Sequence, residues 1–111
     1  MPYEEDLAHR IRELLAEEAG VIEKRMFGGL SFLIGGHISV AASGRGGLML
    51  GCEHEETEAL TAKPHARPMQ RNGRPMRGWV FVDPEGLASQ RALQAWVQRG
   101  VRHARAQPPK G

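Results

Sequence analysis

The sequence predicts one α+β domain with the element order α-β(3)-α-β(2)-α, in which helices pack on a single antiparallel sheet. Two observations lead to this prediction. Apolar residues repeat with helical spacing near both ends of the chain, whereas short apolar runs separated by glycines occupy the middle. Runs of antiparallel strands between helices are typical of the α+β class.

The size and composition of the chain fit one intracellular domain. Its 111 residues are enough for one core, which we expect over about residues 4–106, followed by a flexible tail at 107–111. A single cysteine, Cys52, excludes an internal disulfide. The N-terminus is acidic, and no apolar run approaches the ~20 residues that span a bilayer. We therefore expect a cytoplasmic protein with no membrane partner.

The first predicted element is an amphipathic helix over residues 4–19. Leu7, Ile11, Leu14 and Leu15 lie on one face of such a helix because they follow its 3.6-residue period. The glycine that comes next suits a helix end, since glycine accepts the left-handed conformation of that position.

Three short strands are predicted next, at residues 32–34, 38–41 and 48–50. Gly35-Gly36 predicts a tight hairpin between the first two, because glycine accepts the positive φ of such turns. The glycines of residues 44–47 predict a second, looser hairpin. They do not match a phosphate-binding loop, since a strand and not a helix follows them. Gly28-Gly29 indicates a bulge or a close approach by another backbone.

The second half of the chain is predicted to hold a helix at 54–62, strands near 67–71 and at 78–82, and a helix from 85 or 87 to 104. Asn72-Gly73 predicts a turn between the two strands. Trp79, Phe81 and Trp96 are interpreted as core residues because they lie in the most apolar parts of these elements.

The net charge of +2 hides a strong asymmetry between the two halves of the chain. Residues 1–58 hold five Lys/Arg against eleven Asp/Glu, a balance of −6, and residues 59–111 hold ten against two, a balance of +8. This asymmetry indicates an anionic partner or association between unlike surfaces. The alternative is that the acidic and basic halves complement each other within one fold.

Arginines supply the candidate binding residues. They fall in the basic segment 63–78, which contains no acid, and along one stripe of the last helix that is roughly 120° wide. Arginines in such an arrangement bind carboxylates or phosphates. The alternative is a solvated polar face. The candidates are Arg67, Arg71, Arg74, Arg77, Arg91, Arg99 and Arg102, with Arg105 on the same stripe.

No pattern in the sequence predicts catalysis, a metal or a cofactor. Cys52 and His54 are close in the sequence, but a structural zinc site needs four ligands in paired motifs. No elbow-like motif surrounds any serine. We therefore expect no enzyme, while a ligand pocket near Gly28-Gly29 and Cys52 is kept as an alternative.

Three motifs resemble the TfoX (Sxy) N-terminal-domain family, over about residues 7–106. The first opens the strand region, the second precedes the 78–82 strand, and the third lies in the last helix. They contain Met26, Phe27, Gly28 and Gly29; Gly73, Pro75, Met76, Gly78 and Trp79; and Leu93, Trp96, Val97 and Gly100.

The resemblance implies an α-β(3)-α-β(2)-α domain similar in outline to secretion-chaperone folds, with no catalytic residues. The family's named member regulates DNA-uptake competence together with the cyclic-AMP receptor protein and carries a helical C-terminal domain. The present chain ends at Gly111, so we expect a stand-alone domain to which the competence function does not simply transfer.

Together these observations predict a non-enzymatic regulatory or interaction module of bacterial type. Its partner would be a protein or a transcription complex, bound by the 63–78 loop and the arginine face of the last helix. Direct nucleic-acid binding by the same arginines is the alternative, and a homodimer that covers the sheet edges is another. We expect Gly73 and Gly78 to turn the chain, and Met76 and Trp79 to anchor it.

Overall fold

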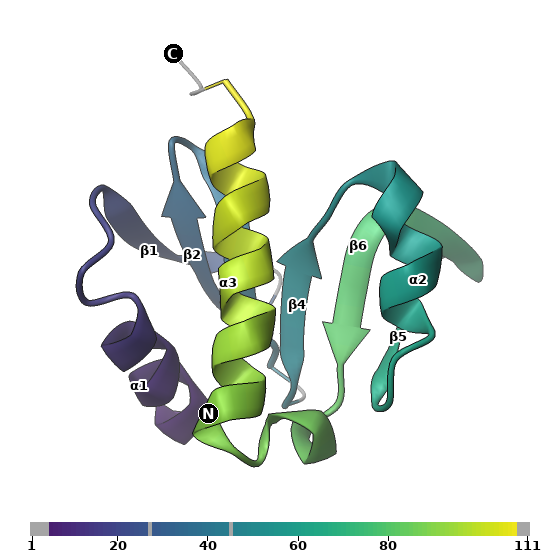
Figure 1. The fold of residues 1–111 in the computed structure, drawn as a ribbon, viewed down its shortest axis with the longest axis horizontal. Coiled ribbons are helices and arrows are strands. Elements are labelled where there is room, and N and C mark those ends of the chain that lie inside the picture. Colours follow the sequence, from purple (N-terminus) through teal and green to yellow (C-terminus); the bar gives the residue numbers. More distant parts are fainter. Residues whose placement is uncertain (1–4, 27, 45, 109–111) are drawn as a thin grey trace.

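Six strands form one antiparallel sheet in the order β1-β2-β3-β4-β6-β5 in the computed structural model, which describes residues 5–26, 28–44 and 46–108 (Figure 1). The strands are β1 (Val21–Met26), β2 (Gly29–Ile34), β3 (His37–Ala42), β4 (Leu48–Gly51), β5 (Ala66–Arg71) and β6 (Arg74–Val82). The helices are α1 (Glu5–Leu14), η1 (His54–Glu56), α2 (Thr57–Thr61), η2 (Pro84–Leu87) and α3 (Gln90–Ala106).

The α+β class is confirmed, but the strand count is corrected from five to six. The additional strand is β1, which pairs with β2 over its whole length, from Val21 opposite Ile34 to Met26 opposite Gly29. Its central residues Glu23, Lys24 and Arg25 are all exposed, because β1 is an edge strand. The strand therefore lacks the alternation of apolar and polar residues that marks a half-buried strand.

The basic segment 63–78 is a β-hairpin over most of its length. The strand predicted near residues 67–71 is present as β5, and the residues just before Gly78 are also a strand and not part of a loop. β6 begins at Arg74 and not at Gly78, and its first residues pair with the end of β5. Asn72 and Gly73 form the predicted turn, both with positive φ (53° and 78°). Farther along β6 the pairing shifts, and Gly78 lies in that irregularity with a φ of 91°.

The predicted glycine turns are confirmed. Gly35 and Gly36 join β2 to β3 with positive φ at both residues. Gly29 makes the predicted close approach, because a Cβ at this position would collide with the carbonyl oxygen of Ala42. A bulge lies elsewhere, where Ser39 is left without a partner between two registers of the β2–β3 ladder and donates its hydroxyl to the carbonyl of Phe32 (2.7 Å).

The first helix is shorter than predicted. It ends at Leu14 and not at Ala19, and the following turns use i to i−3 hydrogen bonds, such as that from the amide of Glu18 to the carbonyl of Leu15. The Glu18 carboxylate lies 2.7 Å from Arg105 of α3. This pairing holds the connection from α1 to β1 against the end of α3.

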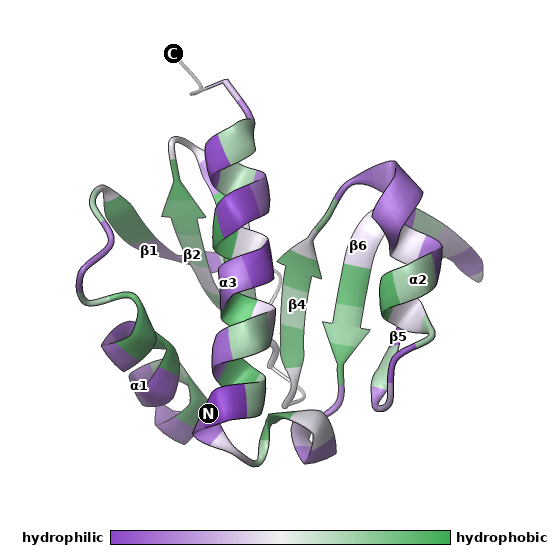
Figure 2. Cartoon of the chain, viewed as in Figure 1, coloured by the Kyte–Doolittle hydropathy of each residue, from purple (hydrophilic) through white to green (hydrophobic). Residues whose placement is uncertain are grey.

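All three α-helices lie on one face of the sheet (Figure 1). α3 packs on β2, β3 and β4, α1 packs beside α3, and α2 packs on β5 and β6. Figure 2 shows apolar residues on β2 and β4 next to α3 and on β6 between α3 and α2, while the surface of α3 itself alternates between apolar and polar residues. The largest fully buried side chains of this interface are Phe32, Ile11, Leu48, Leu50 and Leu93, and the larger Trp96 is nearly so. The opposite face of the sheet, which we call the open face, has no helix on it within the described residues.

The hydroxyl of Thr57 joins α2 to the irregular part of β6. Its oxygen accepts a hydrogen bond from the buried amide of Gly78 (2.8 Å) and donates one to the carbonyl of Glu53 (3.2 Å). A buried amide that loses its partner costs its full desolvation free energy. The hydroxyl therefore stabilises the entry to the second half of β6.

We expect Thr57→Val to lower the free energy of unfolding by about 1–2 kcal/mol, because valine keeps the shape of threonine but cannot accept from Gly78. Urea-induced unfolding measures the change as a shift in midpoint at constant slope. Thr57→Ser keeps the hydroxyl and serves as the control. An equal loss in both variants would contradict the role given to the hydrogen bond.

Arg12 of α1 and Glu23 of β1 form an exposed ion pair with two short hydrogen bonds (2.7 and 2.8 Å). These hydrogen bonds, and then the charge of Arg12, hold the pKa of Glu23 below its ordinary value against a partial desolvation. A carboxyl with a lowered pKa in the folded state stabilises the fold above the unfolded-state pKa, and this contribution is lost as the pH falls through the folded-state pKa.

Glu23→Gln should lower the free energy of unfolding at pH 7 by less than about 1 kcal/mol, because the pair is exposed to solvent. The difference from the wild type should begin to shrink below the ordinary glutamate pKa of about 4.3 and be smaller at about pH 3 than at pH 7, because it is lost as the pH falls through the lowered folded-state pKa. Urea-induced unfolding of both proteins at the two pH values measures it. A difference that persists unchanged at the lower pH would contradict the assignment.

Candidate interaction surface

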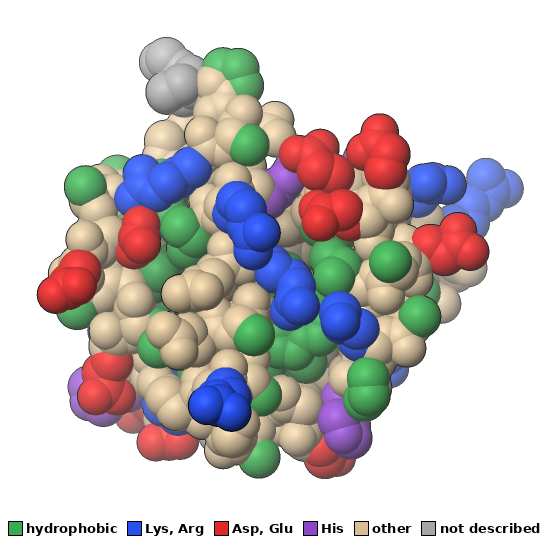
Figure 3. All heavy atoms as spheres, viewed as in Figure 1, with side chains coloured by type: hydrophobic (Ala, Val, Ile, Leu, Met, Phe, Trp, Pro, Cys, Tyr) green, Lys and Arg blue, Asp and Glu red, His purple; other side chains and the backbone are tan. Residues whose placement is uncertain are grey.

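The arginines of α3 divide into exposed and engaged residues. Arg91 and Arg102 are exposed. The guanidinium of Arg99 lies over the ring of Trp96, 4.8 Å from its centroid, and Arg105 pairs with Glu18. Figure 3 shows Lys and Arg side chains along α3 and toward α2. The predicted stripe is therefore present, although two of its members also serve the packing of α3.

The arginines of the β5–β6 hairpin are also unequal. Arg67 pairs with Asp83 at 2.9 Å, and its guanidinium lies 4.9 Å from the centre of the Phe81 ring. Arg77 donates to the carbonyl of His54 (3.2 Å), whereas Arg74 is exposed beside the turn. The side chain of Arg71 lies outside the described part of the structure.

The two groups of arginines do not form one patch. α2 and η1 lie between α3 and the tip of the hairpin (Figure 1), and their acidic side chains gather there in Figure 3. One of them, Glu53, lies 3.4 Å from the imidazole Nδ1 of His103 on α3. The exposed acids of this segment are Glu53, Glu55, Glu56 and Glu58.

The open face carries apolar side chains that the sequence analysis assigned to the core. Trp79 and Phe81 are only half-buried, so their assignment to the core is wrong, whereas Trp96 is buried as predicted. In β6 the side chains of Val80 and Val82 point to the helices, and those of Trp79 and Phe81 therefore point to the other face. The covering helices decide which apolar side of the strand becomes the core.

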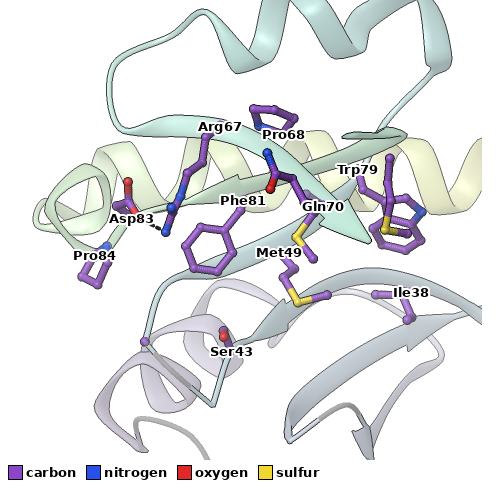
Figure 4. A pocket seen from close by; sticks show the side chains of 13 residues that line it. Ile38, Ser43, Met49, Arg67, Pro68, Gln70, Trp79, Phe81, Asp83 and Pro84 are labelled. Carbon is purple, nitrogen blue, oxygen red and sulfur yellow. Dashed lines mark hydrogen bonds and ion pairs between the residues drawn. The ribbon is translucent and has the colours of Figure 1, made fainter. Parts of the chain in front are cut away.

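A hollow of about 950 Å³ lies on the open face (Figure 4). Its walls come from β3, β4, β5 and β6, and its apolar lining includes Ile38, Met49, Met69, Met76, Trp79 and Phe81. Arg67 and Asp83 lie at one end of the hollow, where the guanidinium of Arg67 donates a hydrogen bond to the carboxylate of Asp83. Met76 and Trp79, which were expected to anchor the chain, both line this hollow.

The methionines and Ile38 were not predicted to form a surface. The pairing register places Met49 opposite Phe81, and Phe81 opposite Arg67, so these three side chains share one face. The alternation in residues 78–82 was the one available signal, because it puts valines and aromatic residues on opposite faces. It does not tell which face is covered.

The described residues offer little to support catalysis. Cys52 is buried, and desolvation raises the pKa of its thiol, which disfavours the nucleophilic thiolate. Within the described residues no group of three or more His, Cys, Asp or Glu side chains could hold a metal ion. The hollow is lined neither by Cys52 nor by Gly28-Gly29, so it is not the ligand pocket considered near those residues.

The family motifs now have places in the structure. Gly28 and Gly29 lie where β1 passes into β2, and Gly73 lies in the hairpin turn. Gly100 of α3 lies against the backbone of Ser39. Phe27 lies outside the described residues.

The sequence pattern of the TfoX N-terminal domain family matches residues 13–104 of the chain. The chain belongs to the TfoX N-terminal domain family. This match covers the sheet, α2 and most of α3, so the family assignment includes the open face as well as the arginine-bearing elements. Comparison with curated proteins and with solved structures gives no significant match. None of the described helices is long and apolar enough to cross a membrane.

Proposed function

We propose that this TfoX N-terminal domain is a non-catalytic regulatory module that binds a protein partner through the open face of its sheet. The observation that carries the proposal is the hollow of about 950 Å³, in which Trp79, Phe81 and three methionines meet on the face that no helix of the described residues covers. Exposed apolar patches of this kind mark interaction sites in soluble proteins.

The composition of the open face supports a protein partner. Aromatic residues and methionine are enriched in the cores of protein–protein interfaces, and methionine adapts its shape to different partners. The ring of Phe81 is held by Arg67, and Arg67 by Asp83, so part of the surface is already ordered before binding. Preorganisation of this kind lowers the entropy cost of association.

Affinity capture from the native cell, followed by a binding measurement with the purified captured protein, tests the proposal. The variants are Phe81→Ser on the open face and Arg102→Glu on α3 as the control. We expect the wild type and Arg102→Glu to bind with similar Kd. Phe81→Ser should raise Kd at least about tenfold, which is the effect expected for a central aromatic residue of an interface. Equal binding by Phe81→Ser, with loss in Arg102→Glu, would move the function to α3.

A second candidate is direct nucleic-acid binding by α3, which the exposure of Arg91 and Arg102 supports. Phosphate contacts release counterions, so this candidate requires an affinity that falls steeply between about 50 and 200 mM salt. Fluorescence anisotropy with duplex and single-stranded DNA at both salt concentrations measures it. Tight binding that Arg91→Glu and Arg102→Glu abolish together would favour this candidate over the open face.

A further inference from the structure

We propose that the segment bound by the open face is amphipathic and acidic, with large apolar side chains in the hollow and carboxylates against its basic border. This inference rests on the proposed function and specifies the chemistry of the partner. Its basis is the distribution of charge around the apolar residues of the face.

The apolar surface extends beyond the hollow. On β1 to β3 the register places Ile22 opposite Leu33 and Leu33 opposite Ile38, so these three residues continue the face toward the β1 edge. Ile22 is 64% exposed, the highest value among the large hydrophobic residues described. A partner that covers the face must therefore bring several apolar side chains, and not a single one.

The border of the face is basic at both edges of the sheet. One register row runs across all six strands, from Lys24 on β1 to Arg67 on β5. It passes through Ser31 and Ala41, which are buried, and through Met49 and Phe81, which line the hollow. Five strand spacings of about 4.8 Å make this row about 24 Å long. A helical segment of that length has about 16 residues.

The charges that remain unbalanced on this border are positive. Among the described residues that line the hollow, Asp83 is the only acidic one, and Arg67 already neutralises its charge. Lys24 is exposed on β1. Arg74 is exposed at the end of the hairpin, where Arg74 and Met76 line a second, smaller hollow. An acidic partner is therefore favoured over a basic one.

Two other occupants fit the same observations less well. A second copy of the chain would bring an identical basic border, so like charges would approach each other. Single-stranded nucleic acid needs free aromatic faces for base stacking, but the guanidinium of Arg67 already lies over the ring of Phe81, and most of the residues that line the hollow are not aromatic.

A displayed library of random 16-residue peptides, selected on the wild type and depleted on Phe81→Ser, tests the inference. We expect the enriched peptides to combine apolar residues at helical spacing with more Asp and Glu than Lys and Arg. For the best peptide, the double variant Lys24→Glu/Arg74→Glu should weaken Kd about tenfold. The control Arg91→Glu/Arg102→Glu carries the same charge change on α3 and should leave Kd within about twofold.

The outcomes separate the inference from the proposed function. Enriched peptides that depend on Phe81 but are neutral or basic would overturn the acidic partner and leave the interaction surface standing. Absence of enrichment over Phe81→Ser would overturn both. Wild-type dimers in sedimentation that Phe81→Ser abolishes would make a second copy the occupant, and oligo(dT) that displaces the peptide would make it nucleic acid. Either result overturns the inference.

Discussion

Phe32→Ala is expected to lower the free energy of unfolding by about 3–5 kcal/mol, the cost of deleting a fully buried aromatic side chain. Phe32 is 1% exposed and lies between the sheet and the helices. Its removal takes away apolar contacts and leaves a cavity, because the two layers are held apart by the other core residues. Urea-induced unfolding followed by circular dichroism measures the loss.

Phe81→Ala is the matched control, because it removes the same side chain from the other face of the sheet. Phe81 is only half-buried, with the guanidinium of Arg67 over its ring. Its loss should cost less than half as much as that of Phe32, since part of the ring is already in water. Equal costs in the two variants would show that the open face is covered in solution and would contradict the two-faced sheet.

Gly100→Leu is expected to cost about 3 kcal/mol or more, at the upper end of the range for overpacking. In an isolated helix the same substitution would stabilise by about 0.8 kcal/mol, because glycine is a poor helix former. In this fold a Cβ at position 100 would collide with the carbonyl oxygen of Ser39 and come within 2.7 Å of Val40. Backbone cannot yield as a flexible side chain can, so α3 would have to move away from β3.

Gln98→Leu, two residues earlier on the same helix, is the control for helix propensity. Gln98 is exposed, so leucine there should change the free energy of unfolding by less than about 0.5 kcal/mol. Both are measured by urea-induced unfolding. A Gly100→Leu protein as stable as the wild type would contradict the close packing of α3 on the Ser39 bulge.

The helices could be predicted from the sequence because their apolar faces follow the 3.6-residue period. Leu93, Trp96 and Val97 are buried in α3 as expected, and Leu7 and Ile11 in α1. The hairpin turns could be predicted equally well, because Gly35-Gly36 and Asn72-Gly73 are dipeptides typical of tight turns between strands.

Features that depend on distant residues could not be predicted. β1 is a strand because β2 supplies its hydrogen bonds, while Glu23 in its centre forms an ion pair with Arg12 on α1. Arg67 is engaged by Asp83 across the hairpin. The same applies to Arg105, whose partner Glu18 is 87 residues away in the chain.

The candidate surface shows the same limit. Its arginines were identified by composition, but composition does not reveal that α2 and η1 separate the α3 group from the hairpin group. The alternation of aromatic residues and valines in β6 predicts two apolar faces. Only the position of α3 and α2 shows that Trp79 and Phe81 are on the face opposite these helices.

The central claim is that the open face, and not the arginine stripe of α3, is the binding surface. Three methionines line its hollow, so ¹³C-methyl methionine labelling together with backbone amide signals reports on both surfaces in one NMR titration with the selected peptide. We predict that the methyl signals of Met49, Met69 and Met76 shift on binding while the amides of α3 near Arg91 and Arg102 stay unchanged. Unmoved methionine signals with shifted α3 amides would contradict the claim.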